Sequence, residues 1–218
     1  MFIRNQWYVA AWDREIGRAP FARMVCGEPI LLYRTLEGGV VAMADLCPHR
    51  LMPLSKGTLE GDTIRCRYHG FAFDRAGQCV DAAALERAPT NFAVHKLYPV
   101  VERHRFVWVW MGEANKADPD LIADLWPCSK PGWTFDGGVD HVKADYRLMI
   151  DNLMDLSHES FVHPSSIGQR EIIEAPLETK TVGERVTVTR WMKDIEAPPF
   201  WRTALGNPGK VDRWQVCE

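Results

Sequence analysis

Hydrophobic residues in the first half of the chain gather in short runs that turn residues separate. Apolar or alternating runs occur at 30–33, 40–43, 63–65, 71–73 and 105–110. Gly38 and Gly39 immediately precede the second run, where a hairpin turn needs a positive φ. Short strands with closely spaced turn signals are typical of a compact antiparallel domain, so this half is predicted to be all-β.

The second half is predicted to contain both helix and strand. Residues 148–161 include no Gly or Pro, which favours one continuous helix, and Pro164 favours its end near His163. Alternating residues on both sides of Gly183 predict a hairpin. Three further elements are expected: a short helix at 119–126, a strand or two at 133–146, and a strand at 211–216.

A polar, turn-rich segment at 111–119 separates the two halves. It predicts a domain boundary, with one domain at 1–112 and a second at 118–218. The predicted fold class is α+β, with an all-β domain at the N-terminus followed by an α+β domain.

Composition narrows the class of protein. The chain has 218 residues, of which 46% are hydrophobic, and a formal net charge of −3. No run of Lys or Arg is present, which argues against nucleic acid as a partner. The first residues lack the apolar region of a signal peptide, and no apolar run reaches membrane-spanning length, so a cytoplasmic protein without membrane contact is predicted.

Two short segments carry the most specific chemistry. Cys47 and His49 form a C-x-H motif, and Cys66 and His69 form a C-x-x-H motif after sixteen intervening residues. In a Rieske [2Fe–2S] centre one iron takes both Cys and the other takes both His, which raises the reduction potential above that of an all-cysteine cluster. A Cys₂His₂ zinc site is the alternative, but zinc sites usually pair like ligands. The mixed pairs therefore favour the Rieske cluster.

A second group of candidate ligands lies on the predicted helix. At about 100° per residue, Asp151, Asp155 and His158 share one stripe, whereas His163 lies about 140° round from His158. A regular helix would not direct both imidazoles at one atom, so a distorted last turn before Pro164 is expected. Two His and one carboxylate form the facial triad of non-haem Fe(II) oxygenases, whose open positions receive O₂.

The spacing Asn-x-x-Asp-x-x-His-x₄-His, formed by Asn152, Asp155, His158 and His163 about ninety residues after the Cys/His motifs, resembles that of the Rieske non-haem iron aromatic oxygenases. The resemblance implies that the two histidines ligate a mononuclear Fe(II) in a helix-grip-like catalytic domain. It implies that Asp155 bridges a ligand histidine to a cluster histidine of the next subunit, in a ring that is commonly a trimer. It places Asn152 beside the iron.

Within the family, the chain most resembles oxygenase components that O-demethylate methoxylated aromatic acids such as vanillate. The similarity extends over nearly the whole chain, in the stretches 5–10, 145–156, 165–169, 197–202 and 211–215. It implies a monooxygenase of aromatic catabolism that uses O₂ and electrons from an NADH-dependent reductase carrying a flavin and an iron–sulfur cluster. Hydroxylation of a methoxy carbon then gives a hemiacetal that loses formaldehyde.

Family members run well beyond 300 residues and take their third iron ligand, an Asp, from a later segment. We therefore expect the chain to end within the catalytic domain, without that ligand and with an open sheet edge. Two other functions stay open on the residues alone. One is a Rieske-type electron carrier or a catalytically inactive truncated oxygenase, and the other is a zinc-stabilised binding module.

Overall fold

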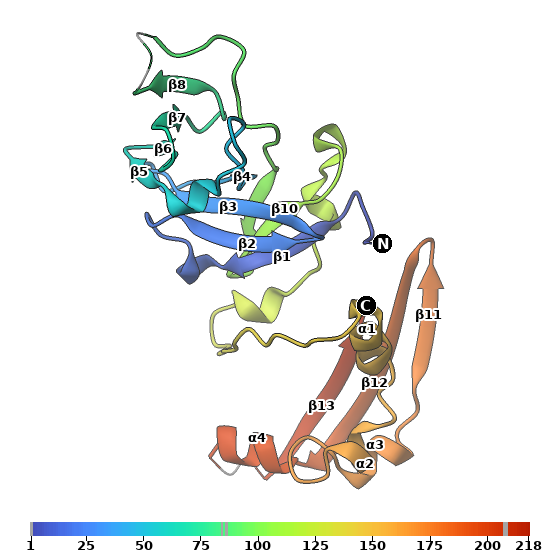
Figure 1. Cartoon of the computed structure of the whole chain (residues 1–218). Coiled ribbons are helices and arrows are strands. Elements are labelled where there is room, and N and C mark those ends of the chain that lie inside the picture. Colours follow the sequence, from blue (N-terminus) through green and yellow to red (C-terminus); the bar gives the residue numbers. More distant parts are fainter. Residues whose placement is uncertain (1, 84, 86, 207–208) are drawn as a thin grey trace. The chain divides into compact units, whose positions relative to one another are not determined.

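The computed structural model describes residues 2–83, 85, 87–206 and 209–218. The chain divides into two compact units, Met1–Gly137 and Gly138–Glu218. The two are drawn in Figure 1 and are described separately here. None of the described helices is both long and apolar enough to cross a bilayer.

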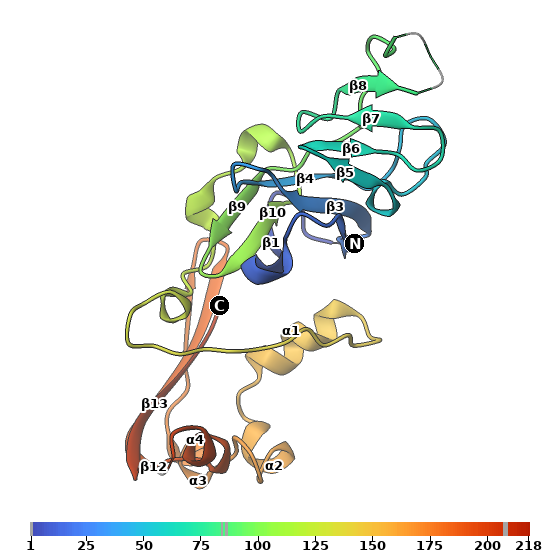
Figure 2. The same ribbon diagram turned by 90° about the vertical axis from the view of Figure 1, so that its left-hand side faces the viewer.

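The first unit consists of antiparallel β-sheets, which confirms the predicted all-β domain. Two three-stranded sheets have the orders β2-β3-β4 and β1-β10-β9, and a four-stranded sheet has the order β5-β6-β7-β8. Figure 2 shows the four strands of the last sheet side by side. The strands of the first unit are β1 (Trp7–Trp12), β2 (Phe21–Val25), β3 (Glu28–Arg34), β4 (Val40–Ala44), β5 (Thr58–Glu60), β6 (Thr63–Arg65), β7 (Phe71–Phe73), β8 (Cys79–Ala82), β9 (Val100–Arg103) and β10 (Phe106–Trp110).

The core of this unit extends to both Cys/His motifs, of which the first follows β4 and the second lies between β6 and β7. Strand β3 is buried along four successive residues, Ile30 to Tyr33, and Gly38 adopts φ +93° in the turn before β4 as expected. Phe73 and Ile64 belong to the same buried cluster as β3, and so do Cys47 and Cys66. The two cysteines are therefore part of the main hydrophobic core of the unit.

The first unit extends past the boundary predicted at 112–118. Trp7, Trp110 and Ile122 form a second buried cluster, and the Trp7 indole donates to the Asp118 carbonyl at 2.7 Å. These contacts hold the segment after β10 against the unit as far as Ile122, and the compact unit itself continues to Gly137. A composition change marked the end of the last strand, but the burial of tryptophan side chains decides where the compact unit ends.

The prediction of strands at 133–146 was wrong, because residues 133–144 form neither helix nor strand. The aromatic side chains pack on tryptophans instead of contributing to a sheet. Trp133 lies 4.9 Å from Trp126 and Phe135 lies 5.7 Å from Trp12, both measured between ring centroids. The short helix predicted at 119–126 is present as two single 3₁₀ turns, Pro119–Leu121 and Trp126–Cys128.

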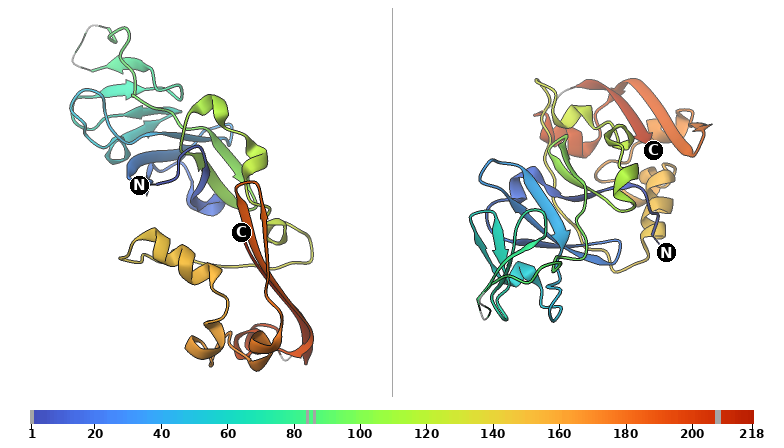
Figure 3. Two further views of the ribbon diagram at one scale, coloured as in Figure 1. Left: turned by 90° about the vertical axis from the view of Figure 1, so that its right-hand side faces the viewer. Right: turned by 90° about the horizontal axis from the view of Figure 1, so that it is seen from above.

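The second unit combines a three-stranded antiparallel sheet, of order β11-β12-β13, with four short helices. Its elements are α1 (Tyr146–Met154), α2 (Glu159–Val162), α3 (Arg170–Glu174), β11 (Glu178–Val182), β12 (Arg185–Glu196), α4 (Pro199–Ala204) and β13 (Lys210–Cys217). Strands β12 and β13 lie side by side, with α2 and α3 near one end (Figure 3). The predicted hairpin around Gly183, which has φ +60°, and the last strand are confirmed.

The predicted helix at 148–161 is broken, and α1 ends at Met154. Asp155 leaves the helical region with ψ 85°, and its Oδ1 accepts a hydrogen bond from the Ser157 N–H at 2.9 Å. The Ser157 hydroxyl donates to the same oxygen at 2.5 Å. Asp competes in this way with the helical hydrogen-bond pattern, so the absence of Gly and Pro was not sufficient to keep the helix continuous.

Candidate metal centres

The first candidate centre is built from two loops with the same backbone hydrogen bonds. In the first loop the Cys47 N–H donates to the Met52 carbonyl at 2.9 Å, and the Leu51 N–H donates to the Cys47 carbonyl at 2.8 Å. Leu51 has φ +56°, a value that L-residues rarely adopt. The loop thus turns tightly between its cysteine and the fifth residue beyond it.

The second loop repeats this arrangement residue for residue. The Cys66 N–H donates to the Phe71 carbonyl at 2.7 Å, and the Gly70 N–H donates to the Cys66 carbonyl at 3.0 Å. Gly70 has φ +75° at the position equivalent to Leu51. Only the histidine differs, since it is the second residue after the cysteine in one loop and the third in the other. The C-x-H and C-x-x-H motifs differ in spacing, but their matching turns allow each loop to present one cysteine and one histidine.

Each pair of like ligands is brought together. Cys47 and Cys66 are each 1% exposed, and the Cys66 thiol lies within hydrogen-bonding reach of Cys47. Burial, and then the neighbouring thiol, raises the pKa of Cys47 to about 11 in the metal-free protein. The imidazoles of His49 and His69 lie edge to face with ring centroids 4.5 Å apart. Desolvation and then His69 lower the pKa of His49, which favours the neutral ring that a metal requires.

These four side chains fit a Rieske cluster better than a single ion. Imidazole nitrogens lie about 2.1 Å from a metal, so two rings on one ion have centroids roughly 4.5–5.5 Å apart. The pairing of thiol with thiol and imidazole with imidazole matches the distribution over two irons. Within the described ranges, no three His, Cys, Asp or Glu side chains surround a single point.

Side chains outside the motifs hold each loop in place. The buried Asp45 carboxylate accepts two hydrogen bonds from Ser55, from its N–H and its hydroxyl, both at 2.6 Å. Arg65 donates to the Gly70 carbonyl at 2.7 Å and forms ion pairs with Glu60 and Asp81. Charge-assisted hydrogen bonds of this kind fix the geometry of a loop before any metal is bound.

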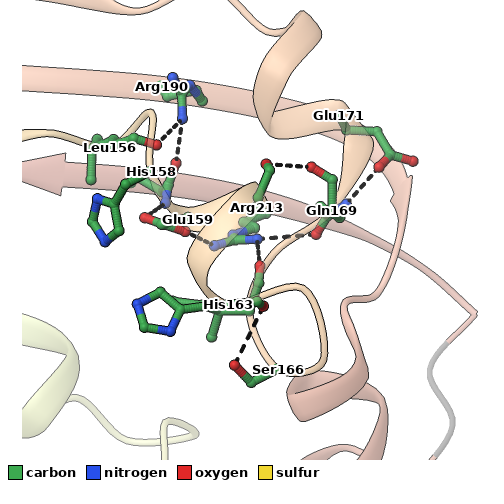
Figure 4. Close-up of polar contacts among 12 residues, drawn as sticks. Leu156, His158, Glu159, His163, Ser166, Gln169, Glu171, Arg190 and Arg213 are labelled. Atoms are coloured by element: carbon green, nitrogen blue, oxygen red, sulfur yellow. Dashed lines mark hydrogen bonds and ion pairs between the residues drawn. The ribbon is translucent and has the colours of Figure 1, made fainter.

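The second candidate centre lies at α2, a single turn of helix. His158 is its N-cap and His163 its C-cap, so the break at Asp155 places one imidazole at each end of the turn. Their ring centroids are 5.5 Å apart, and both rings project from the same side of α2 in Figure 4. This separation falls within the range for two ligands of one ion. A break before His158, rather than a distortion after it, brings the histidines together.

Two more of the predicted residues adjoin His158. The Asn152 amide nitrogen lies 3.4 Å from its Nε2, and the Asp155 backbone carbonyl accepts a hydrogen bond from its Nδ1. That contact orients the ring and leaves Nε2 as the nitrogen available to a metal. The Asp155 carboxylate is turned to Ser157 rather than to either histidine. Asp151, on the predicted stripe, lies on the exposed α1.

A buried polar cluster beneath α2 was not predicted from the sequence. It joins Glu159 to Arg213, with a 2.8 Å ion pair, and also contains Arg190 and Gln215. Arg190 and Arg213 occupy strand positions that alternate with exposed residues, on the face that carries Val188 and Met192. A charged residue at a core-facing strand position was the signal that could have identified them.

Two family models together match most of the chain. The Rieske [2Fe–2S] domain matches residues 6–98, and the vanillate O-demethylase oxygenase C-terminal domain matches residues 142–218. The chain belongs to the Rieske non-haem iron oxygenases. The matched Rieske domain is a [2Fe–2S] domain and a solved relative contains non-haem iron, so the family resemblance carried by the motifs is confirmed.

Characterised Rieske oxygenases resemble the chain along its whole length. A vanillate O-demethylase oxygenase subunit of Pseudomonas sp. (strain HR199 / DSM 7063) is 46% identical over 100% of this chain and 62% of the relative. The toluene-4-sulfonate monooxygenase system iron-sulfur subunit of Comamonas testosteroni is 42% identical over 100% of this chain and 64% of the relative. The chain thus spans somewhat less than two thirds of the length of these relatives.

A solved Rieske oxygenase has the same fold. The crystal structure of dicamba monooxygenase bound to 3,6 dichlorosalicylic acid superimposes with a TM-score of 0.88 at 34% identity, over 99% of this chain and 64% of that one. A second structure of dicamba monooxygenase, with non-haem iron and dicamba, gives a TM-score of 0.78 at 35% identity. The predicted fold class, a β-rich Rieske domain followed by an α+β region, is confirmed.

Proposed function

We propose that this protein is the oxygenase component of a Rieske monooxygenase that O-demethylates a methoxylated aromatic acid such as vanillate. The observation that carries the proposal is the presence of two donor sets in one chain. The paired Cys and His loops suit an electron-transfer cluster, and the paired histidines at α2 suit a separate mononuclear iron. A pure electron carrier has no use for the second set.

The residues have distinct roles in this proposal. Cys47 and Cys66 hold one iron of the cluster, while His49 and His69 hold the other. His158 and His163 bind the mononuclear Fe(II). When bound, this iron supplies activation of O₂ with electrons received through the cluster.

Asp155 and Asn152 act next to the iron ligands. Both hydrogen bonds to Ser157 use Oδ1 of Asp155, and Oδ2 has no hydrogen-bond partner among the described residues. Asp155 is exposed, which suits a carboxylate that receives a histidine of another subunit. The Asn152 amide lies beside the His158 nitrogen that binds the iron, so it adjoins the iron site without being a ligand. Electron transfer between subunits then requires a ring-shaped homo-oligomer, for which we propose a trimer.

The overall reaction is balanced by one NADH. The aryl methyl ether, O₂, NADH and a proton give the phenol, formaldehyde, water and NAD⁺. The oxidised carbon is the methyl group, which leaves as formaldehyde when the hemiacetal breaks. A flavin- and iron–sulfur-containing reductase delivers the two electrons, and we place the system in the cytoplasm.

The decisive experiment uses the full-length gene product with its reductase, NADH and vanillate. We expect formaldehyde and the demethylated phenol in equal amounts, and a protein with about three iron and two acid-labile sulfide per chain. His158→Ala is expected to lower the iron by one per chain and leave the sulfide unchanged. Other methoxybenzoates and aromatic sulfonates are the comparison substrates, since one relative is named for toluene-4-sulfonate.

An electron carrier is the second candidate function. It is favoured by one observation: no third His, Cys, Asp or Glu joins His158 and His163 within the part of the chain that the structure describes. If the gene product contains two iron per chain, undergoes cluster reduction and turns over no substrate, the carrier replaces the oxygenase as the conclusion.

A further inference from the structure

The segment that carries the two histidines is held from below by two buried arginines. The Arg190 guanidinium donates to the Leu156 carbonyl at 3.0 Å, two residues before His158. Arg213 pairs with Glu159, the residue directly after His158. In Figure 4 both imidazoles project to one side of α2, away from these contacts.

Arg213 also grips the segment after the second histidine. Its Nη1 donates to the Ile167 carbonyl at 2.7 Å and to the Gln169 side-chain oxygen at 3.0 Å. One guanidinium therefore connects the residue after His158 to the loop that follows His163. A planar group with several fixed donors is suited to join backbone segments in this way.

Glycine closes the same loop. The Gly168 N–H donates to the His163 carbonyl at 2.9 Å. A Cβ at this position would lie 2.6 Å from the Glu159 carbonyl oxygen and 2.8 Å from that of His163. The backbone after His163 thus returns into direct contact with α2, and there is no space for a side chain between them.

This arrangement is an unusual use of charge. Arg190, Arg213 and Glu159 are 5%, 4% and 6% exposed, so two cations and one carboxylate are buried together. Gln215 lies between them, since it donates to Glu159 and accepts from Arg190 at 3.3 Å. Replacement of a buried ion pair by apolar residues of similar size is often neutral or stabilising, so stability alone does not account for the cluster.

We infer that Arg213, Glu159 and Arg190 are positioning residues that set the separation and orientation of the His158 and His163 imidazoles for the mononuclear iron. They touch neither metal nor substrate. They act through the Leu156 carbonyl before His158, the Glu159 side chain between the two histidines and the Ile167 carbonyl after His163, and they hold the ligand pair in place before metal binds. The inference rests on the proposed iron site and adds to it the residues that preorganise it.

The triple substitution Glu159→Leu, Arg213→Met and Arg190→Met separates positioning from simple packing. It removes all three buried charges together and fills the space with apolar atoms, so no charge is left buried without a partner and the fold is expected to retain its stability. The Arg213 guanidinium, which contacts both Glu159 and the Ile167 carbonyl, is lost in this variant. We therefore expect metal affinity at the two histidines to fall about 10- to 100-fold while the free energy of unfolding and the cluster absorbance stay at parental values.

The measurement is a Co(II) titration of the full-length gene product with an intact Rieske cluster and an empty mononuclear site. The d–d absorption of Co(II) reports occupancy and ligand geometry. Arg170→Gln with Glu174→Gln is the matched control, because it removes an ion pair of 2.7 Å that lies exposed on α3. Arg213→Lys alone is expected to bind Co(II) with an affinity between those of the parent and the fully apolar variant. Lysine retains the charge beside Glu159 but cannot hydrogen-bond to both backbone segments at once.

Each outcome decides a separate point. If the parent binds Co(II) and the triple variant binds it equally well, the positioning role is overturned and the iron site stands. If the parent binds no metal at His158 and His163, the proposed iron site fails. In that case NMR of the protein with labelled histidine still tests positioning. A contact between the two imidazole rings that persists in the metal-free triple variant would overturn the inference.

Discussion

Gly70 offers a quantitative test of the cluster loops. Substitution by Ala places a Cβ on a residue with φ +75°, which costs about 1–2 kcal/mol. That Cβ would lie 2.7 Å from the Ala83 Cβ, so the second loop or its neighbour must move, at a further cost of about 1–3 kcal/mol. We expect Gly70→Ala to lower the free energy of unfolding by about 2–5 kcal/mol and to reduce cluster retention.

Gly61→Ala is the control for backbone strain alone. Gly61 has φ +56° in the turn between β5 and β6, and an added Cβ would meet nothing within 4 Å. Its expected cost is about 1 kcal/mol, with the cluster retained. Urea unfolding of both variants gives the stability, and visible absorbance per chain gives the cluster content. Equal losses in both variants, with equal cluster content, would show that the close contact behind Gly70 has no effect.

Two further substitutions test groups elsewhere in the chain. Burial raises the pKa of Glu28, but hydrogen bonds from Lys96, Tyr98 and Arg4 outweigh it and lower the pKa from 4.5 to about 2. Glu28 therefore stabilises the fold above about pH 4.5 and loses this effect as the pH falls towards 2. Over that window the free energy of unfolding of the parent should fall by about 2 kcal/mol more than that of Glu28→Gln. Identical pH profiles of the two proteins would contradict this. Asp155→Asn keeps an oxygen for Ser157, so we expect it to retain mononuclear iron but lose electron transfer between subunits, whereas Asp155→Ala should lose iron as well. Iron content and single-turnover reduction distinguish the two variants, and retention of iron by both would refute the structural role of Asp155.

The amino-acid pattern was sufficient for the first centre because its information is local. A cysteine and a histidine two or three residues apart can lie in one turn whatever surrounds it, and four such ligands of two kinds restrict the metal chemistry to very few choices. The strands followed in the same way from alternation and turn residues. The elements most clearly predicted, β3, β4 and β10, are those whose apolar runs are buried in the core.

The second centre depended on interactions that helix propensity does not include. Residues 148–161 contain nothing that forbids a helix, yet one Asp side chain ends it by accepting hydrogen bonds from Ser157. That break converts two histidines about 140° apart on a regular helix into a facing pair 5.5 Å apart. Spacing identified the candidate ligands, but a side-chain hydrogen bond decided their geometry.

Residue types and their spacing were thus enough to name the cluster and the class of fold and to propose the ligands, since these depend on chemistry within one turn or one strand. The partnership of Glu159 with Arg213, the shared turn of the two cluster loops and the extension of the first unit to Gly137 arose only in three dimensions. Each of these three features joins residues from separate segments of the chain. A buried charge forms its ion pair only after folding has excluded water and brought those segments together.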